Sequence, residues 1–119
     1  MEYTVHTLNG QDILEIHDED FRINSLQDAL DLLGSAMFKQ IFKIIIRRDH
    51  LCPDFFDLKT RLAGEILQKF STYDMQLAIV GDFSDLESKS LHDFIRESNR
   101  TGRIIFVNST KEAKERLGE

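Results

Sequence analysis

The sharpest candidate for a binding site is the run Gly81-Asp82-Phe83-Ser84, which directly follows an apolar stretch at residues 75–80. A carboxylate and a hydroxyl between a buried strand and a helix lie at the edge where open α/β sheets bind ligands. A helix N-terminus at that edge could hold a small anion or a phosphate. The alternative is structural, because aspartate and serine also favour turns and helix caps. No glycine-rich phosphate loop is present, so a nucleotide is not specifically indicated.

Other polar residues should lie along the same edge, because the carboxyl ends of parallel strands meet there. Residues 47–49 (Arg-Arg-Asp) follow one apolar run, and residues 108–109 (Asn-Ser) follow another. The start of the helical segment after residue 52 adds two more carboxylates. We therefore predict a rim that binds a ligand or a partner and is made of Asp54, Asp57, Gly81, Asp82, Phe83 and Ser84.

The single cysteine, Cys52, is a candidate reactive thiol. His50 lies two residues before it, and Pro53 suits the first position of a helix. Thiols at helix N-termini are more readily ionised and more nucleophilic. A nucleophile also needs a positioned base and an oxyanion site, and the sequence identifies neither. A buried structural role is the favoured interpretation, since free cysteine behaves as a small hydrophobic residue.

The four histidines predict no metal site. They are scattered along the chain and lack the spacing of metal ligands: His6, His17, His50 and His92. Together, His50 and Cys52 supply two ligands, whereas zinc sites use three or four from the protein. We therefore expect neither a metal nor another cofactor, and we predict no catalytic set.

The stretch that positions these groups runs from residue 52 to residue 82. Its first part predicts one long amphipathic helix over about residues 53–70, because apolar residues recur every three or four positions. The stripe consists of Phe55, Leu58, Leu62, Ile66 and Phe70. Gly64 interrupts this helix, although glycine costs about 1 kcal/mol relative to alanine there. We expect a close packing contact at Gly64, with a contact to a partner as the alternative.

The remaining elements follow from turns, caps and apolar runs. Asn9-Gly10 predicts a tight turn between strands at residues 3–8 and 12–17. Ser25 and Asp28 have capping-box spacing, which predicts a helix that buries Leu26, Leu30, Leu33 and Met37, with Ala29 and Ala36 alongside. Unbroken apolar runs at residues 42–46, 75–80 and 104–107 are typical of strands covered on both faces.

The last two helices are placed by the same capping signal. Ser84 with Glu87 predicts a helix that buries Leu91, Phe94 and Ile95 and ends near Asn99, with Gly102 in the following turn. Ser109 with Glu112 predicts a final helix that packs through Ala113 and Leu117.

Taken together, these elements predict an α/β fold in one domain over residues 1–119. An N-terminal β-hairpin precedes three β-α units, in the order β-β-α-β-α-β-α-β-α. Right-handed crossovers join the parallel strands, giving a mixed five-stranded sheet with helices packed on it.

Composition excludes several functional classes. The chain has 119 residues and a net charge of −6, which argues against a nucleic-acid partner. No apolar run approaches the roughly 20 residues of a membrane helix, so no membrane partner is expected. The N-terminus lacks the basic and apolar regions of a secretory signal. With a single cysteine, the chain fits a reducing compartment, and we expect it in the cytoplasm.

Three spaced strings resemble a bacterial family of single-domain proteins of unknown function. They are FFDLKTRLAGEILQKF (55–70), LAIVGDF (77–83) and FIRESNR (94–100). The order of elements is also similar to that of STAS domains, the folds of anti-sigma factor antagonists and transporter tails. That similarity implies a regulatory or interaction role through fold alone. STAS regulators of the anti-sigma type carry a phosphorylated serine after an aspartate, whereas the corresponding pair here is Asp57-Leu58.

Two hypotheses about function follow. The first is a non-enzymatic interaction or regulatory domain that contacts a protein partner through the predicted rim. The alternative is a domain that binds a small ligand or anion, or an enzyme, using the same rim. We also predict a homodimer, because the first hairpin leaves a strand edge available for pairing.

Overall fold

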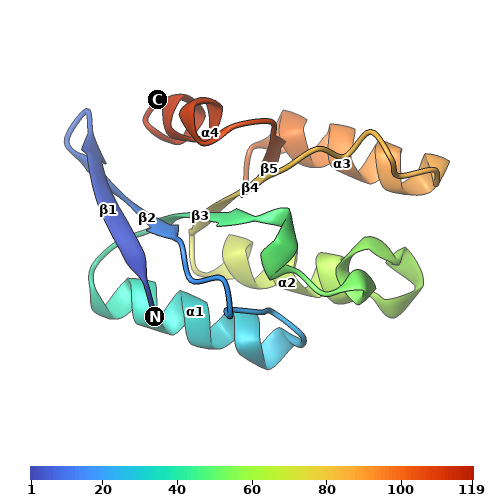
Figure 1. The fold of residues 1–119 in the computed structure, drawn as a ribbon, viewed down its shortest axis with the longest axis horizontal. Helices are drawn as coiled ribbons and strands as arrows, with labels where there is room; N and C mark the ends of the chain where they lie inside the picture. The colour runs from blue at the N-terminus through green and yellow to red at the C-terminus, as the bar shows by residue number, and fades with distance from the viewer.

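The computed structural model describes residues 1–119 as a mixed five-stranded sheet with four α-helices (Figure 1). The strands are β1 (Tyr3–Leu8), β2 (Gln11–Ile16), β3 (Lys43–Arg47), β4 (Gln76–Val80) and β5 (Ile104–Val107). The helices are α1 (Leu26–Phe38), α2 (Leu62–Thr72), α3 (Lys89–Thr101) and α4 (Thr110–Leu117). This arrangement confirms the predicted fold class and order of elements. None of the helices has both the length and the apolar character needed to cross a bilayer.

The strands lie side by side in the order in which they occur in the chain. β1 and β2 are antiparallel, and the other neighbours are parallel. The predicted turn is confirmed, since Asn9 and Gly10 have φ values of 53° and 77° and Leu8 pairs with Gln11. Positive φ at both central residues matches the twist of a two-residue hairpin.

Helices cover both faces of the sheet. On one face α1 and α2, together with Phe94 and Ile95 of α3, pack on the larger core cluster. On the other face α4 packs through Ala113 and Leu117 on a smaller cluster. Figure 1 shows α1 and α2 on one side of the strands and α4 on the opposite side. β3, β4 and β5 are therefore buried from both sides, which explains their unbroken apolar runs.

The first helix confirms its cap and part of its predicted buried stripe. Ser25 Oγ accepts a hydrogen bond from the backbone N–H of Asp28 at 3.2 Å. The fully buried residues are Ala29, Leu32, Leu33 and Ala36. Met37, predicted to be buried, is 38% exposed. Leu33 is buried as predicted, whereas Leu26 and Leu30 are half-buried against the larger core cluster.

The predicted long helix over residues 53–70 is wrong. Two 3₁₀ turns, Pro53–Phe56 and Leu58–Thr60, replace its first half, and α2 begins at Leu62. Asp57 Oδ1 accepts from the N–H of Lys59, while Thr60 Oγ1 donates to the carbonyl oxygens of Asp54 and Asp57. These local bonds compete with helical ones. Arg61 then takes a left-handed conformation with φ of 66°, which breaks the helix.

The predicted start of the third helix is also wrong. α3 begins at Lys89, where Ser88 Oγ accepts from the N–H of Leu91 at 3.2 Å. Ser84 and Ser88 are both residues of the capping type, so the sequence offers two starts, and the structure uses the later one. The other end is as expected, with Gly102 at φ of 83° closing α3. The cap of α4 at Ser109 is confirmed as well.

Gly64 does not mark a close packing contact. It is exposed on α2, and a Cβ atom built there would have no heavy atom within 4 Å. The expected packing contact within the domain is therefore wrong. What remains at Gly64 is the intrinsic penalty of glycine inside a helix.

Replacing Gly64 with alanine should therefore stabilise the isolated domain. The gain in helix propensity is about 1 kcal/mol, and nothing opposes it. In urea melts the midpoint should rise with an unchanged slope.

Gly102→Ala is the matched comparison, because a Cβ atom there also has free space but the φ of 83° is left-handed. That conformation costs an alanine about 1–2 kcal/mol, so its midpoint should fall. A lower midpoint for Gly64→Ala would contradict the interpretation of an unopposed propensity gain.

Candidate functional site

The ends of β3 and β4 form an open hollow at the carboxyl edge of the sheet. Its volume is about 560 Å³. It is lined by Arg47, Arg48, Asp49, Val80, Gly81, Asp82 and Asp85. Gly81 and Asp82 of the predicted rim thus lie beside the expected neighbours at residues 47–49. Ser84 and residues 108–109 do not line this hollow.

Arg48 is the most strongly held side chain of the hollow. Its guanidinium donates to Asp85 Oδ1 at 2.6 Å and Asp85 Oδ2 at 3.1 Å, and also to the carbonyl oxygen of Asp82. Hydrogen bonding between Arg48 and Asp85 holds the pKa of the Asp85 carboxyl below its usual range and raises the pKa of Arg48. Asp85 was not predicted from sequence, because its partner lies 37 positions away.

Glycine is required at residue 81 because the Arg48 side chain lies against it, one residue beyond the ends of β3 and β4. A Cβ atom at Gly81 would lie 2.8 Å from Arg48 Cβ, which is closer than real contacts allow. Arg47 pairs with Val80 across the two strands, so the next residues on each strand meet directly. Glycine is the one residue type without a Cβ, so it permits this approach.

Aromatic side chains bring the two predicted halves of the rim together. The Arg48 guanidinium carbon lies 5.2 Å from the centre of the Phe56 ring and 5.6 Å from that of Phe83. The two rings are 6.2 Å apart. Phe83 also meets Phe106 edge-on at 5.3 Å, which anchors its loop to the core. Phe56 therefore holds the segment that bears Asp54 and Asp57 beside the loop after β4.

The polar residues of the rim are exposed and shape their own backbone. Asp82 Oδ1 accepts from the N–H of Ser84 at 2.9 Å, and hydrogen bonds from Ser84 lower the pKa of Asp82. This is a turn, and the helix N-terminus expected at Ser84 lies instead at Ser88. An anion bound by the start of α3 next to Asp82 is therefore not supported. Asp54, Asp57, Asp82 and Ser84 all face solvent.

Cys52 is half-buried against the larger core cluster. It precedes the short 3₁₀ turn Pro53–Phe56, so the α-helix N-terminus expected beside it is absent. His50 does not contact its thiol, because both ring nitrogens are hydrogen-bonded elsewhere. The structure therefore brings neither a helix dipole nor a base to Cys52.

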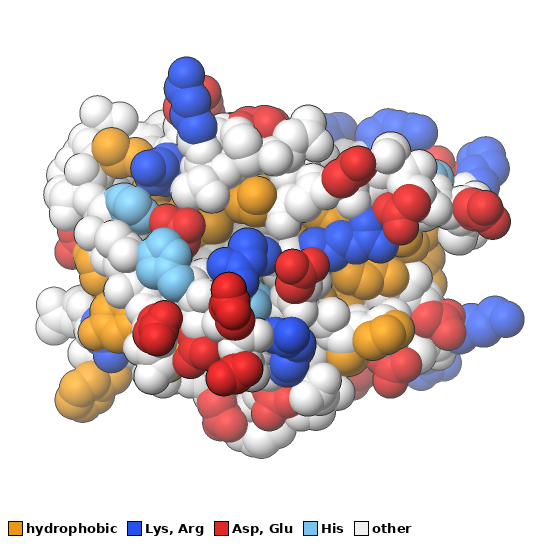
Figure 2. Space-filling model, viewed as in Figure 1, with side chains coloured by type: hydrophobic (Ala, Val, Ile, Leu, Met, Phe, Trp, Pro, Cys, Tyr) orange, Lys and Arg blue, Asp and Glu red, His pale blue; other side chains and the backbone are white.

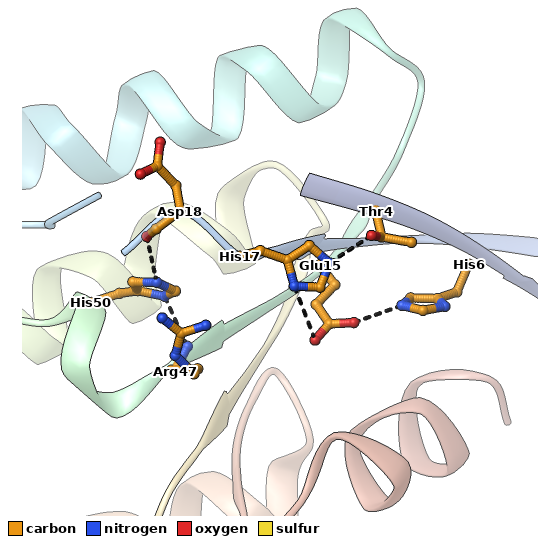
Figure 3. A network of polar contacts seen from close by, with 7 residues as sticks. All are labelled: Thr4, His6, Glu15, His17, Asp18, Arg47 and His50. Atoms are coloured by element: carbon orange, nitrogen blue, oxygen red, sulfur yellow. Dashed lines mark hydrogen bonds and ion pairs between the residues drawn. The ribbon is translucent and has the colours of Figure 1, made fainter. Parts of the chain in front are cut away.

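His50 is a fully buried polar side chain that joins the turn after β3 to the connector between β2 and α1 (Figure 3). Its Nδ1 accepts from the backbone N–H of Arg47, and its Nε2 donates to the carbonyl oxygen of Asp18, both at 3.0 Å. Phe21 meets the ring edge-on at 5.5 Å. Burial, followed by the charge of Arg47, lowers the pKa of His50. Since both nitrogens are needed in these roles, the ring is neutral.

A second polar cluster lies across the β-hairpin (Figure 3). His6 Nε2 is 2.6 Å from Glu15 Oε1, and His17 Nδ1 is 3.9 Å from Glu15 Oε2. His17 Nε2 lies 2.5 Å from Thr4 Oγ1. Figure 2 shows histidines beside acidic side chains on this open face of the molecule. The register fixed by the turn at residues 9–10 could have revealed this cluster, because it places Thr4 opposite Glu15.

The hairpin cluster resembles a nucleophile, a base and a carboxylate in chemical type only. The separation of 3.9 Å between His17 and Glu15 exceeds hydrogen-bond range. No group of three or more His, Cys, Asp or Glu side chains in the chain could hold a metal ion. The contacts join β1 to β2 through side chains, in addition to the backbone ladder.

One family profile matches the chain, under the description Domain of unknown function (DUF4180), and it spans residues 8–117. The chain belongs to this family. The DUF4180 match runs from the last residue of β1 to the last residue of α4, so it includes the hollow, the rim and His50. No curated protein and no solved structure matches the chain. The DUF4180 assignment agrees with the expected single-domain family of unknown function.

Within this DUF4180 domain, His50 should make stability depend on pH. Its folded pKa lies below the unfolded value of about 6.5, so the unfolded chain binds the extra proton. This contribution is complete above about pH 6.5 and is lost as the pH falls from there toward the folded pKa. The slope it adds is at most about 1.4 kcal/mol per pH unit.

Urea melts of wild type and His50→Gln between pH 8 and pH 5 measure this effect. The variant should be less stable at pH 8, because it loses buried hydrogen bonds, and its free energy of unfolding should depend less on pH. The other titratable groups are common to both proteins, so their contributions cancel in the difference between the two free energies of unfolding. If that difference were constant over the whole pH range, His50 would not be the buried neutral group described above.

Proposed function

We propose that this DUF4180 chain is a non-enzymatic, cytoplasmic interaction domain that contacts a protein partner through its rim. The contact surface consists of Arg48 and the predicted residues Asp54, Asp57, Gly81, Asp82, Phe83 and Ser84. The observation that carries the proposal is the Arg48 guanidinium, which lies over Phe56 and Phe83 beside an open hollow. Arginine and aromatic residues are enriched in protein interfaces and among their hot spots.

The shape and charge of the rim favour a protein over an enclosed small molecule. The hollow is open to solvent, and three exposed carboxylates, those of Asp49, Asp82 and Asp85, line it. Arg48 is already oriented by Asp85, so little side-chain freedom is lost when a partner binds. The exposed carboxylates favour a partner surface that presents lysine or arginine.

The order of elements, similar to that of STAS domains, supports an interaction role by analogy of fold. The departure at Asp57-Leu58 limits the analogy, because no hydroxyl occupies the position of the phosphorylated serine. Leu58 belongs to a 3₁₀ turn, and the neighbouring Thr60 hydroxyl is hydrogen-bonded to the carbonyl oxygens of Asp54 and Asp57. We therefore propose regulation through contact rather than through a phosphorylation switch at this position.

Affinity capture from a native lysate with immobilised wild type, Asp82→Arg and Arg48→Ala tests the proposal. Both variants should lose a protein that wild type retains, because one reverses a rim charge and the other removes the stacked guanidinium. Loss of a central hot-spot side chain typically costs about 2 kcal/mol or more, which is about thirtyfold in affinity.

Arg100→Ala is the matched control. Arg100 also pairs with a carboxylate, Glu97, but on the exposed surface of α3. This variant should capture the same proteins as wild type. If Asp82→Arg and Arg48→Ala also captured the wild-type set, the rim would be the wrong surface.

A second candidate function is binding of a small anion in the same hollow, and it is favoured by Arg47. This side chain lines the hollow, yet it takes part in none of the ion pairs of the structure. A guanidinium without a carboxylate partner can bind phosphate or carboxylate through paired N–H groups.

Thermal denaturation with phosphate, sugar phosphates and carboxylates tests the anion hypothesis. A ligand at 100 times its dissociation constant stabilises the folded state by about 2.7 kcal/mol, which gives a clear rise in melting temperature. Arg47→Gln should abolish the rise. Equal melting temperatures with and without every anion would eliminate this candidate and leave the protein partner.

A further inference from the structure

The outer edge of β1 has unpaired backbone groups at alternate residues. The N–H of His17 donates to the carbonyl oxygen of Glu2, and this bond fixes which residues of the antiparallel ladder face β2. Because inward and outward groups alternate along a strand, Thr4, His6 and Leu8 bond toward β2. The N–H and C=O groups of Tyr3, Val5 and Thr7 therefore point away from the sheet. No strand pairs with this edge.

This edge lacks the features that keep natural edge strands apart. Such strands usually carry lysine, proline, a bulge or an inward-pointing charge. β1 has the sequence YTVHTL, with no proline, lysine or carboxylate, and it pairs with β2 without a bulge. Tyr3 and Val5 are 43% and 42% exposed although they are large and apolar. β5 at the other edge of the sheet is also uncharged, but all four of its residues are buried, whereas most of β1 is exposed.

Exposed apolar side chains extend this surface from β1 onto α1. Tyr3 and Val5 lie opposite Ile16 and Leu14, so they point to the face of the sheet that α1 covers. Lys39 Nζ lies 5.3 Å from the centre of the Tyr3 ring, which places the end of α1 next to β1. Phe38 at that end is 90% exposed. Figure 2 shows hydrophobic side chains along the left margin, where Figure 1 places β1 and the end of α1.

We propose that a second copy of this chain pairs with β1 along this edge, antiparallel and around a two-fold axis at Val5. This register joins all three outward-facing residues, because Tyr3 of one copy meets Thr7 of the other and Val5 meets Val5. The two sheets become one continuous sheet. The axis is perpendicular to the sheet, so both α1 helices lie on the same side, with Tyr3 and Val5 of both copies between them.

The β1 edge suits a second copy because it is complementary to itself. The net charge of −6 on each chain opposes close approach elsewhere, but β1 carries no carboxylate, so this repulsion is small at the edge. In the register centred on Val5, Thr4 lies opposite His6 and Glu2 lies opposite Leu8, so no like charges meet. Tyrosine beside threonine and valine beside valine are cross-strand pairs that stabilise antiparallel strands. The proposal is independent of the rim and of any partner that binds there.

Sedimentation equilibrium of the full chain tests this interface. Wild type should be dimeric at micromolar concentration. Val5→Lys should raise the dissociation constant of the dimer at least about tenfold, because it places like charges opposite each other at the axis. Tyr73→Lys is the matched control, because Tyr73 is 45% exposed at the end of α2, and it should sediment like wild type. Circular dichroism verifies that both variants are folded.

A charge exchange tests the register itself. Val5→Lys and Val5→Glu should each be monomeric, whereas an equimolar mixture should recover dimers, because lysine then meets glutamate at the axis. In wild type, hydrogen exchange at the amides of Tyr3, Val5 and Thr7 should slow as protein concentration rises. A monomeric wild type, a Val5→Lys variant that still dimerises, or a mixture that stays monomeric would each overturn the proposal.

Discussion

The pairing of β3 with β4 determines where the other polar groups of this domain lie. Ile44, Ile45 and Ile46 pair with Leu77, Ala78 and Ile79, and all six are buried. A slip by one residue would exchange the side chains between the two faces, and the different packing of the two core clusters opposes it. The same register pairs Arg47 with Val80, and it places Arg48 against Gly81 one residue further along. The hollow at the end of these strands is a consequence of core packing.

The same constraint explains the roles of the side chains around the hollow. Arg48 leaves the sheet at a fixed point, so Asp85 and the rings of Phe56 and Phe83 can hold it in one orientation. His50 lies at the end of the turn after β3. Its ring supplies hydrogen-bond partners for the backbone N–H of Arg47 and the carbonyl oxygen of Asp18. A buried and fully hydrogen-bonded ring of this kind stabilises the path of the chain.

The sequence predicts well the features that are set by single residues or by unbroken runs. The turn at Asn9-Gly10, the buried strands and the caps at Ser25 and Ser109 all follow from local chemistry. It predicts poorly where two local signals compete. Ser84 and Ser88 are both suitable helix caps, and the structure uses Ser88. The apolar periodicity of residues 53–70 continues through the two 3₁₀ turns, because Phe55 in the first turn and Leu62 at the start of α2 are both buried. The contacts of His50 and Asp85 depend on residues more than 30 positions away, so no local pattern reveals them.

The late start of α3 has a mechanical consequence for the domain. Residues 81–88 form an irregular connection. Phe83 packs against Phe56 and Phe106, Arg48 binds Asp85 and Asp82, and His92 Nε2 contacts the carbonyl oxygen of Leu86. Segments with few buried contacts open at a free-energy cost well below that of global unfolding. We therefore expect the loop at the rim to open at a lower free-energy cost than the strands beneath it, which keep their register.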